Sequence, residues 1–300
     1  MSHGRAVGLM VLVTLMWSIA GVVTRHLDSA RSFEVTFWRS LFNALALLVA
    51  FALMRGPSLV QRIAQGGKAL WFSGLCWTVM YTNFMVAITM TTVATVLVTM
   101  SIAPLVTALF ARLFLHHRLP ARTWAAIGVA GIGIAWMFGR QALEGGSSLT
   151  GILVALGVPL AGATNWTLLQ HIQQRQRRNP DAPEPDMLPA VLIGALGSAA
   201  ITLPLAWPMS ASAHDLSLLG LLGVVQLAIP CLIAVRVARV LPAAEVALIA
   251  LLEVIFGVLL AWVGADEAPG PTALQGGVLV IGALLGNELL ALQRRRSGLA

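Results

Sequence analysis

Nine residues in the third apolar run of the chain, Cys-Trp-Thr-Val-Met-Tyr-Thr-Asn-Phe at positions 76–84, carry groups that could bind a solute. Helical spacing of i, i+4 and i+7 places Trp77, Tyr81 and Phe84 on one face. Asn83 points well away from that face. A buried polar group without a partner costs about 1–3 kcal/mol, so these groups need protein, water or solute partners. The pattern predicts a face that lines a cavity; aromatic packing and interhelical hydrogen bonds are the structural alternative.

Other apolar runs carry polar or aromatic side chains at a similar depth. Threonines in membrane helices often bond to their own preceding turn, so each threonine alone also fits a structural role. Groups from several runs at one depth favour a shared solute site near the middle of a membrane. The predicted binding residues are Trp17, Trp77, Tyr81, Asn83, Phe84, Thr95, Thr99, Asn165, Trp166, Gln226 and Glu253.

Glu253 is the most costly of these residues to place in a membrane. A charge at the bilayer centre costs several kcal/mol unless it is paired or neutralised, and ionisable residues at that depth indicate function. We expect no Lys or Arg as deep in another run. Glu253 is therefore predicted to bind the ammonium group of a solute or to carry a coupling proton. A protonated carboxyl that bonds to a facing helix is the structural alternative.

Three prolines interrupt apolar runs close to these polar groups: Pro104, Pro159 and Pro230. Proline has no N–H, so the carbonyl four residues earlier loses its helical donor. Within a membrane such a carbonyl must be satisfied by protein or by a wet cavity. The three prolines are predicted to break helices at a gate or site, with curvature for packing as the alternative.

Ten apolar runs must position these side chains. The chain has 300 residues, of which 58% are hydrophobic and 10% charged, whereas a soluble domain carries roughly 25% charged residues. A run of about 20 apolar residues spans a bilayer as a helix. The sequence therefore predicts an all-α membrane protein with ten transmembrane helices, at about 6–25, 33–54, 69–89, 92–115, 121–138, 149–172, 187–207, 216–237, 242–264 and 272–292.

The basic residues are distributed unevenly between the connections. With a cytoplasmic N-terminus, the inside segments hold 15 of the 19 Lys and Arg, and only Arg25, Arg31, Arg39 and Arg140 lie outside. This asymmetry follows the positive-inside rule. It predicts a multi-pass protein of the inner (plasma) membrane with both termini in the cytoplasm, and it argues against nucleic acid as a partner. The charged, Pro-rich segment 174–186 is interpreted as a flexible cytoplasmic link.

The sequence contains no motif typical of an enzyme or a metal site. Cys76 and Cys231 lie inside apolar runs, and the six histidines show no ligand spacing. Nucleophile elbows, Walker loops and EF-hands are absent. We predict no enzymatic activity, cofactor or metal. The first run imitates a signal peptide, but its removal would leave nine spans and disturb the charge pattern, so we expect it to be retained.

The chain repeats itself weakly at a shift of about 150 residues, which aligns residues 93–124 with 243–274. Five spans in each half, an odd number, require the second half to enter the membrane inverted. The turn at 115–122 is basic and its counterpart at 264–270 is acidic, in agreement with opposite orientations. We predict two five-helix repeats, residues 1–145 and 146–300, around a central cavity, as in alternating-access carriers.

The residues also resemble a known family. Ten spans in two halves, a Trp early in the first span of each half, and a ninth span that ends in Leu-Leu-Glu-Val-Ile-Phe-Gly-Val-Leu-Leu-Ala-Trp-Val-Gly-Ala-Asp-Glu are similar to the drug/metabolite transporter superfamily. Within it the EamA-type exporters match best, and the branch that exports aromatic amino acids is the candidate. Members usually have Leu-Glu-Pro-Val in the ninth span, whereas Val254 follows Glu253 here; the counterpart Pro104 is present. The resemblance implies a basket of helices around a central cavity and leaves the substrate open.

These observations predict a secondary transporter that exports small metabolites, mainly amino acids including aromatic ones, by alternating access. Its expected partners are this solute and membrane lipid. A proton-coupled multidrug exporter that uses Glu253 is the alternative, and an intramembrane enzyme or lipid flippase is the alternative from another class. Small-x-x-x-small pairs, Gly4 with Gly8 and Gly282 with Gly286, are expected to pack inside a monomer rather than to form a weak homodimer.

Overall fold

The computed structural model describes residues 1–30, 32–55, 58–91, 93–116, 119–144, 148–181, 185–265 and 270–296, and every regular element among them is helical. The first half contains α1 (His3–Thr24), α2 (Ser32–Arg55), α3 (Ser58–Gln65), α4 (Gly67–Met90), α5 (Val93–Met100), α6 (Ala103–Leu115) and α7 (Ala121–Glu144). The second half contains α8 (Leu149–Arg178), α9 (Pro189–Thr202), η1 (Leu203–Leu205), α10 (Ala213–Leu221), η2 (Leu222–Ala228), α11 (Ile229–Val237), α12 (Ala243–Ala250), α13 (Leu252–Ala265) and α14 (Pro271–Arg296).

Among the residues that the structure describes, seven helical segments are long and apolar enough to cross a membrane. The three other predicted runs correspond to α4, which carries the polar stretch 76–84, and to α9 and α14, which contain the shorter apolar segments Pro189–Leu205 and Pro271–Asn287. The all-helical membrane architecture is therefore confirmed, and the count of ten transmembrane helices stays a prediction.

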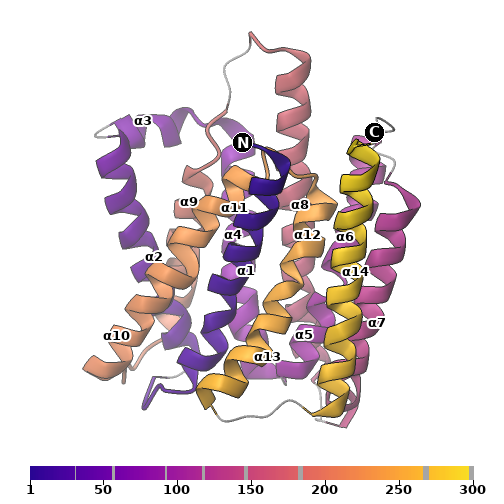
Figure 1. Cartoon of the computed structure of the whole chain (residues 1–300). Coiled ribbons are helices and arrows are strands. Elements are labelled where there is room, and N and C mark those ends of the chain that lie inside the picture. The colour runs from indigo at the N-terminus through magenta and orange to yellow at the C-terminus, as the bar shows by residue number, and fades with distance from the viewer. Residues whose placement is uncertain are drawn as a thin grey trace.

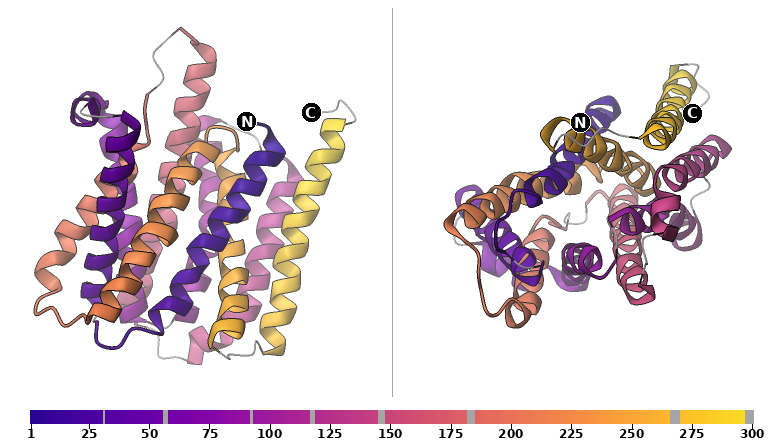
Figure 2. Two further views of the ribbon diagram at one scale, coloured as in Figure 1. Left: turned by 60° about the vertical axis from the view of Figure 1, so that its left-hand side comes forward. Right: turned by 90° about the horizontal axis from the view of Figure 1, so that it is seen from below.

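The helices stand side by side as a bundle with both termini at one end (Figure 1). Helices α7 and α14 pack along each other at one edge, and α4 packs against both α8 and α9 in the interior. The view along the bundle shows the helices arranged around its centre (Figure 2). The largest buried apolar cluster joins α1, α2, α4, α8, α9, α11 and α12. This cluster fixes the helices that carry the candidate site.

Two predicted spans are each broken at the same position of the proposed repeat. Helix α5 ends at Met100 and α6 starts at Ala103, while α12 ends at Ala250 and α13 starts at Leu252. The shift of 150 residues places α5 on α12, residue for residue. Pro104 lies in the first turn of α6, where its missing N–H is tolerated. The second break has no proline, because Val254 occupies the position that corresponds to Pro104.

Packing partners also recur with the two halves exchanged. Helix α1 packs against α11 and α13, and its predicted counterpart α8 packs against α4 and α6. Likewise α2 packs against η2 of the second half, and α9, the counterpart of α2, packs against α4 of the first half. The boundary between the predicted repeats falls at 145–147, outside the described residues, as do parts of the turns at 115–122 and 264–270.

Glycines allow the closest helix crossings. A Cβ at Gly194 of α9 would lie 3.1 Å from the carbonyl carbon of Trp77 and 3.2 Å from the amide nitrogen of Thr78. The backbones of α4 and α9 therefore meet directly, and this contact holds Trp77 in place. By contrast, a Cβ at Gly4, Gly8, Gly282 or Gly286 would meet nothing within 4 Å, so the expected packing of these glycines inside the monomer is wrong.

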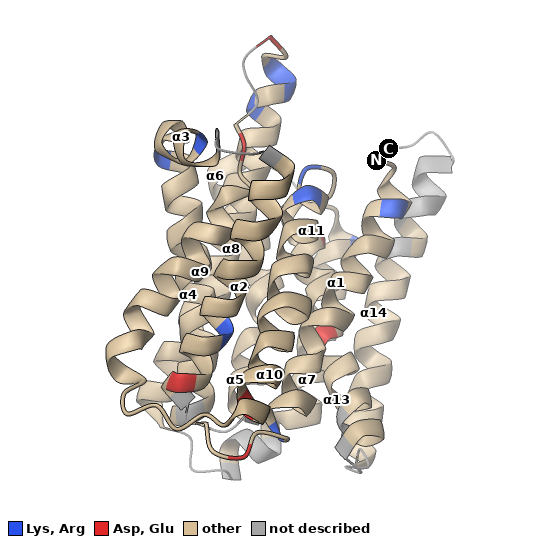
Figure 3. Ribbon diagram, turned by 90° about the vertical axis from the view of Figure 1, so that its left-hand side faces the viewer, with Lys and Arg blue, Asp and Glu red and all other residues tan. Residues whose placement is uncertain are grey.

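Most Lys and Arg gather at one end of the bundle, where α3 and the C-terminal end of α8 lie (Figure 3). We call it the basic end, defined by Lys68, Arg112, Arg175, Arg236 and Arg239. The interpretation of 174–186 as a flexible link is wrong for its first part, because α8 continues to Arg178. Three arginines in the last turn of α8 favour this extension, since cations stabilise a helix C-terminus.

Candidate functional site

A cavity of about 140 Å³ lies among the helices of both halves. Its described lining residues come from α1, α2, α4, α5, α6, α8, η2, α11, α12 and α13. The lining residues are Trp17, Arg39, Trp77, Met80, Tyr81, Phe84, Met100, Ala103, Thr107, Val158, Pro159, Gly162, Ala163, Trp166, Gln226, Leu227, Cys231, Ala247, Ala250 and Glu253. Seven of the eleven predicted binding residues are among them: Trp17, Trp77, Tyr81, Phe84, Trp166, Gln226 and Glu253.

Aromatic rings form one wall of the cavity. The ring centroids of Trp77 and Tyr81 are 5.5 Å apart on α4. Trp166 on α8 meets Trp77 edge to face, with centroids 5.7 Å apart and planes at 90°. The predicted face of Trp77, Tyr81 and Phe84 therefore does line a cavity. These rings offer apolar surface and π faces to an aromatic or cationic solute.

Arg39 on α2 is the charged lining residue that the sequence interpretation missed. It is 2% exposed and lies about 10 Å along the helix from its start at Ser32. The expectation that no Lys or Arg lies as deep as Glu253 is therefore wrong, and so is the assignment of Arg39 to the outside.

A polar stripe on α2 explains the burial of this cation. Thr36, Arg39, Ser40 and Asn43 follow i, i+3, i+4 and i+7 spacing and are all buried, whereas Leu45 and other apolar residues of α2 are exposed. The stripe faces the protein and the apolar face is free to meet lipid. This stripe was the signal in the sequence that could have located Arg39.

The two charged residues of the cavity come from different halves of the chain. The charges of Arg39 and Glu253 are close enough to interact, without a direct ion pair among the described residues. The Nη2 of Arg39 donates to the carbonyl of Tyr81 at 3.2 Å. Glu253 is the second residue of α13, two positions after the break at Leu251, and is partly buried.

Several polar atoms around the cavity have no hydrogen-bond partner among the described residues. Three of them are the Nε of Arg39, the Nε1 of Trp77 and the Oε1 of Gln226. All three residues line the cavity. An unpaired buried donor or acceptor costs about 1–3 kcal/mol, so a polar solute that pairs with these atoms would recover that free energy.

Gln226 is held by an irregular part of its helix. Residues Leu222–Ala228 form a π-helical segment that leads into Pro230, and such segments frequently occur at functional sites. The Nε2 of Gln226 donates to the carbonyl of Trp17 at 3.2 Å. This bond connects α1 to the second half and leaves the Oε1 of Gln226 available.

Four predicted binding residues do not line the cavity. The Nδ2 of Asn83 donates to the carbonyl of Val154 on α8 at 3.1 Å. Asn165 is fully buried and accepts from the Oγ of Ser73 at 2.6 Å. These amides connect α4 to α8, the alternative role given for polar groups in membrane helices.

The two threonines Thr95 and Thr99 are also away from the cavity, on α5. The Oγ1 of Thr99 donates to the carbonyl of Thr95 at 2.7 Å, the local bond that threonines often form in helices. Of the three predicted proline sites, Pro159 lies inside α8 and lines the cavity. Pro104 and Pro230 are buried and do not line it, although each directly neighbours a lining residue in the sequence.

At the end opposite the basic end, two carboxylates hold two loops together. Asp215 of α10 accepts from the backbone N–H groups of Asp28, Ser29 and Ala30 at 2.8–3.1 Å. Glu34 accepts from the backbone N–H groups of Ser210 and Ala211 at 2.9 and 2.7 Å. We call these contacts the loop clamp.

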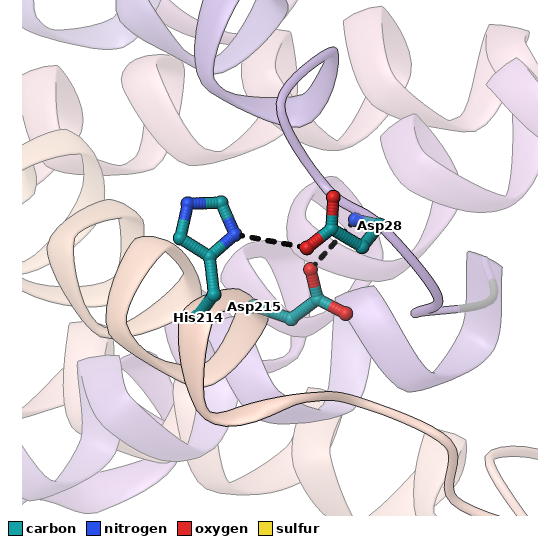
Figure 4. A group of neighbouring side chains, drawn as sticks. All are labelled: Asp28, His214 and Asp215. Carbon is teal, nitrogen blue, oxygen red and sulfur yellow. Dashed lines mark hydrogen bonds and ion pairs between the residues drawn. The ribbon is translucent and has the colours of Figure 1, made fainter.

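The side chain of His214 completes the group drawn in Figure 4, with its Nδ1 3.3 Å from the Oδ2 of Asp28. Asp28, His214 and Asp215 have the donor types of a metal site. However, the Asp215 carboxylate is already engaged by backbone N–H groups of the loop. The group is accounted for as a structural contact between the α1–α2 and α9–α10 loops.

Comparisons with known proteins agree with this architecture. Residues 4–139 match the EamA-like transporter family. A crystal structure described only as a protein is 16% identical, with a TM-score of 0.73 over 97% of this chain and 99% of the other, which shows a shared fold. No curated protein matches the chain significantly. The family match points to a multi-pass membrane transporter rather than an enzyme. The predicted resemblance is therefore confirmed for residues 4–139, in agreement with the drug/metabolite transporter superfamily, whereas the branch that exports aromatic amino acids stays a prediction.

Proposed function

We propose that this protein exports small zwitterionic metabolites, mainly amino acids including aromatic ones, across the inner membrane. One observation carries the proposal: a cation and an anion, Arg39 and Glu253, line the same cavity as three tryptophans. An α-amino acid carries a carboxylate and an ammonium group on one carbon. The cavity offers a complementary charge for each, and rings for the side chain.

The head group of the solute would bind between the two charges. The Nε of Arg39, which lacks a protein partner, would donate to the solute carboxylate, a charge-assisted hydrogen bond. The carboxylate of Glu253 would accept from the solute ammonium. The rings of Trp17, Trp77 and Trp166, which line the cavity, would then receive the side chain and stabilise it by stacking and burial.

Size and charge disfavour the competing solutes. A cavity of about 140 Å³ is smaller than the roughly 300–1,000 Å³ of sites that hold drug-sized ligands. A phosphorylated sugar carries at least one further negative charge and no cation, so Glu253 would repel it while a single Arg39 attracts it. A zwitterion satisfies both residues at once.

Transport would proceed by alternating access between two inverted repeats, 1–145 and 146–300. The matching breaks at Ser101 and Leu251 and the exchange of packing partners support this interpretation. In inverted-repeat carriers, solutes bind near the midplane at broken helices, and Glu253 lies two positions after such a break. Positive-inside topology supports cytoplasmic termini at the basic end.

Proton-coupled drug export through Glu253 is the second candidate. It is favoured by the position of Glu253, an acid that faces a cavity within the membrane, where carboxyl groups often form proton relays. Under this alternative, cations without a carboxylate would be good substrates and a pH gradient would drive transport.

A substrate panel in proteoliposomes tests the proposal. The purified chain should exchange labelled phenylalanine, tryptophan and leucine faster than phenethylamine, which lacks the carboxylate, or phenylpropionate, which lacks the ammonium. Arg39→Gln should reduce the exchange of phenylalanine more than that of phenethylamine. Preferred transport of glucose 6-phosphate, or of lipophilic cations under a pH gradient, would overturn the assignment.

A further inference from the structure

A second hollow lies on the outer surface of the bundle, away from the solute cavity. Helices α4 and α6 both pack against α8, and the groove between them, of about 430 Å³, runs over α8. Its lining consists of Phe72 of α4, Phe110, Phe114 and Leu115 of α6, and Thr164, Thr167, Leu168 and His171 of α8. Phe114 is 66% exposed and Phe72 48% exposed, so the groove opens outward to the surroundings of the bundle.

The walls of the groove are apolar and aromatic. Phe110 and Phe114 meet edge to face with centroids 5.4 Å apart. In a chain that spans a membrane, this surface faces hydrocarbon rather than water. The groove from Thr164 to His171 covers eight residues of α8, on the order of 10 Å of helix. Its walls suit the upper part of an acyl chain.

One buried polar group in the groove has no partner. Thr167 is 6% exposed, and its Oγ1 has no hydrogen-bond partner among the described residues. One turn earlier, the Oγ1 of Thr164 donates to the carbonyl of Leu160 at 2.7 Å. The Thr167 hydroxyl does not make this local bond, so the lining of the groove contains an unpaired hydrogen-bond donor.

Cations stand at the basic end of all three helices that form the groove. Lys68 precedes Phe72 by one turn, Arg175 follows His171 by one turn, and Arg112 precedes Leu115 by three residues, so each shares a helix face with a lining residue. The three cations are exposed, and none has an ion-pair partner among the described residues. A ligand in the groove would have its end close to this positive charge.

We propose that this groove binds an anionic phospholipid. An acyl chain lies along the phenylalanines, the Thr167 hydroxyl donates to an ester carbonyl, and Lys68, Arg112 and Arg175 contact the phosphate and the headgroup. Basic pockets between transmembrane helices on the cytoplasmic side bind such headgroups. The site is separate from the solute cavity, since no residue lines both.

Native mass spectrometry of the purified full-length chain with phosphatidylglycerol or phosphatidylcholine of identical acyl chains tests the proposal. Phosphatidylglycerol should bind more tightly. The double variant Lys68→Gln/Arg175→Gln should weaken its binding about 30-fold, since each cation near the membrane surface contributes about a factor of five. A matched variant, Arg177→Gln/Arg236→Gln, removes the same charge at the same end from faces outside the groove and should bind like wild type. Equal losses in both variants, or equal binding of the two lipids, would overturn the proposal.

Two further measurements remain informative if the charge variants fold poorly. Thr167→Val keeps the shape of the side chain and should weaken both lipids about fivefold, because the ester carbonyl is common to them. Phosphatidylglycerol with a photoreactive acyl chain should label wild-type protein within α4, α6 and α8 around Phe72, Phe114 and His171. Labelling confined to other helices would contradict the site.

Discussion

The crossing of α4 and α9 at Gly194 allows a quantitative test of the packing that holds Trp77. In Gly194→Ala the new Cβ would lie 3.1 Å from the carbonyl carbon of Trp77 and 3.2 Å from the amide nitrogen of Thr78. These are backbone atoms inside a helix, so they cannot rotate away and the two helices must separate. Overpacking of this kind costs about 1–3 kcal/mol. At roughly 2.1 cal/mol/K per residue, this free energy lowers Tm by about 2–5 °C for a chain of 300 residues.

Gly128→Ala is the matched control, because a Cβ at Gly128 of α7 would meet nothing within 4 Å. Alanine is the better helix former, so this variant should gain about 0.5–1 kcal/mol. Thermal unfolding of both variants in the same detergent, followed by intrinsic fluorescence, measures the difference. The Gly194→Ala variant should also transport more slowly, since Trp77 moves with α4. A Gly194→Ala protein as stable as Gly128→Ala would refute the close crossing.

Five other substitutions separate the roles of the cavity from those of the scaffold. Glu253→Gln should abolish driving by a pH gradient if this carboxyl couples protons; unchanged driving would restrict Glu253 to solute binding or structure. Trp17→Ala and Trp166→Ala should each raise the KM for aromatic substrates with little change in membrane level, and wild-type kinetics in both would place the site on other faces. Asn83→Leu should leave KM unchanged and lower the free energy of unfolding by about 1–3 kcal/mol, because it removes the bond to Val154; a raised KM would return Asn83 to the site. Glu34→Ala should destabilise the protein by about 2–4 kcal/mol through loss of charge-assisted bonds in the loop clamp, measured by thermal unfolding; an unchanged Tm would show that the clamp holds nothing.

The helical architecture could be predicted from the sequence because apolar runs near 20 residues have one stable arrangement in lipid. The breaks inside two runs were harder to locate. Pro104 marks the first break, but the second, at Leu251, has no local signal and follows only from the shift of 150 residues that aligns it with Ser101. The short helix α3 escaped prediction because it is too short to span a membrane.

The residues that line the cavity were predictable where helical spacing places several of them on one face of a helix, as for Trp77 and Tyr81. Depth alone was a weaker guide: Asn83 and Asn165 lie at a similar depth to the cavity residues but bond to neighbouring helices. Arg39 was missed because the charge count that predicted the topology assigned it to the outer end of its span. That count takes no account of the helix face on which a charge lies. The burial of Arg39 depends on contacts with α4, which are distant in sequence and invisible to local patterns.

The central claim, that Arg39 pairs with the carboxylate of a zwitterionic solute, is tested most directly by one equilibrium binding measurement. Phenylalanine and phenethylamine, which differ by that carboxylate, are titrated against wild-type protein and Arg39→Gln. Truncating one partner of a buried charge pair costs about 2–5 kcal/mol, so wild type should prefer phenylalanine by at least about 30-fold. In Arg39→Gln this preference should disappear while phenethylamine binding changes little. A wild-type protein that binds both alike, or a preference that survives Arg39→Gln, would contradict the account.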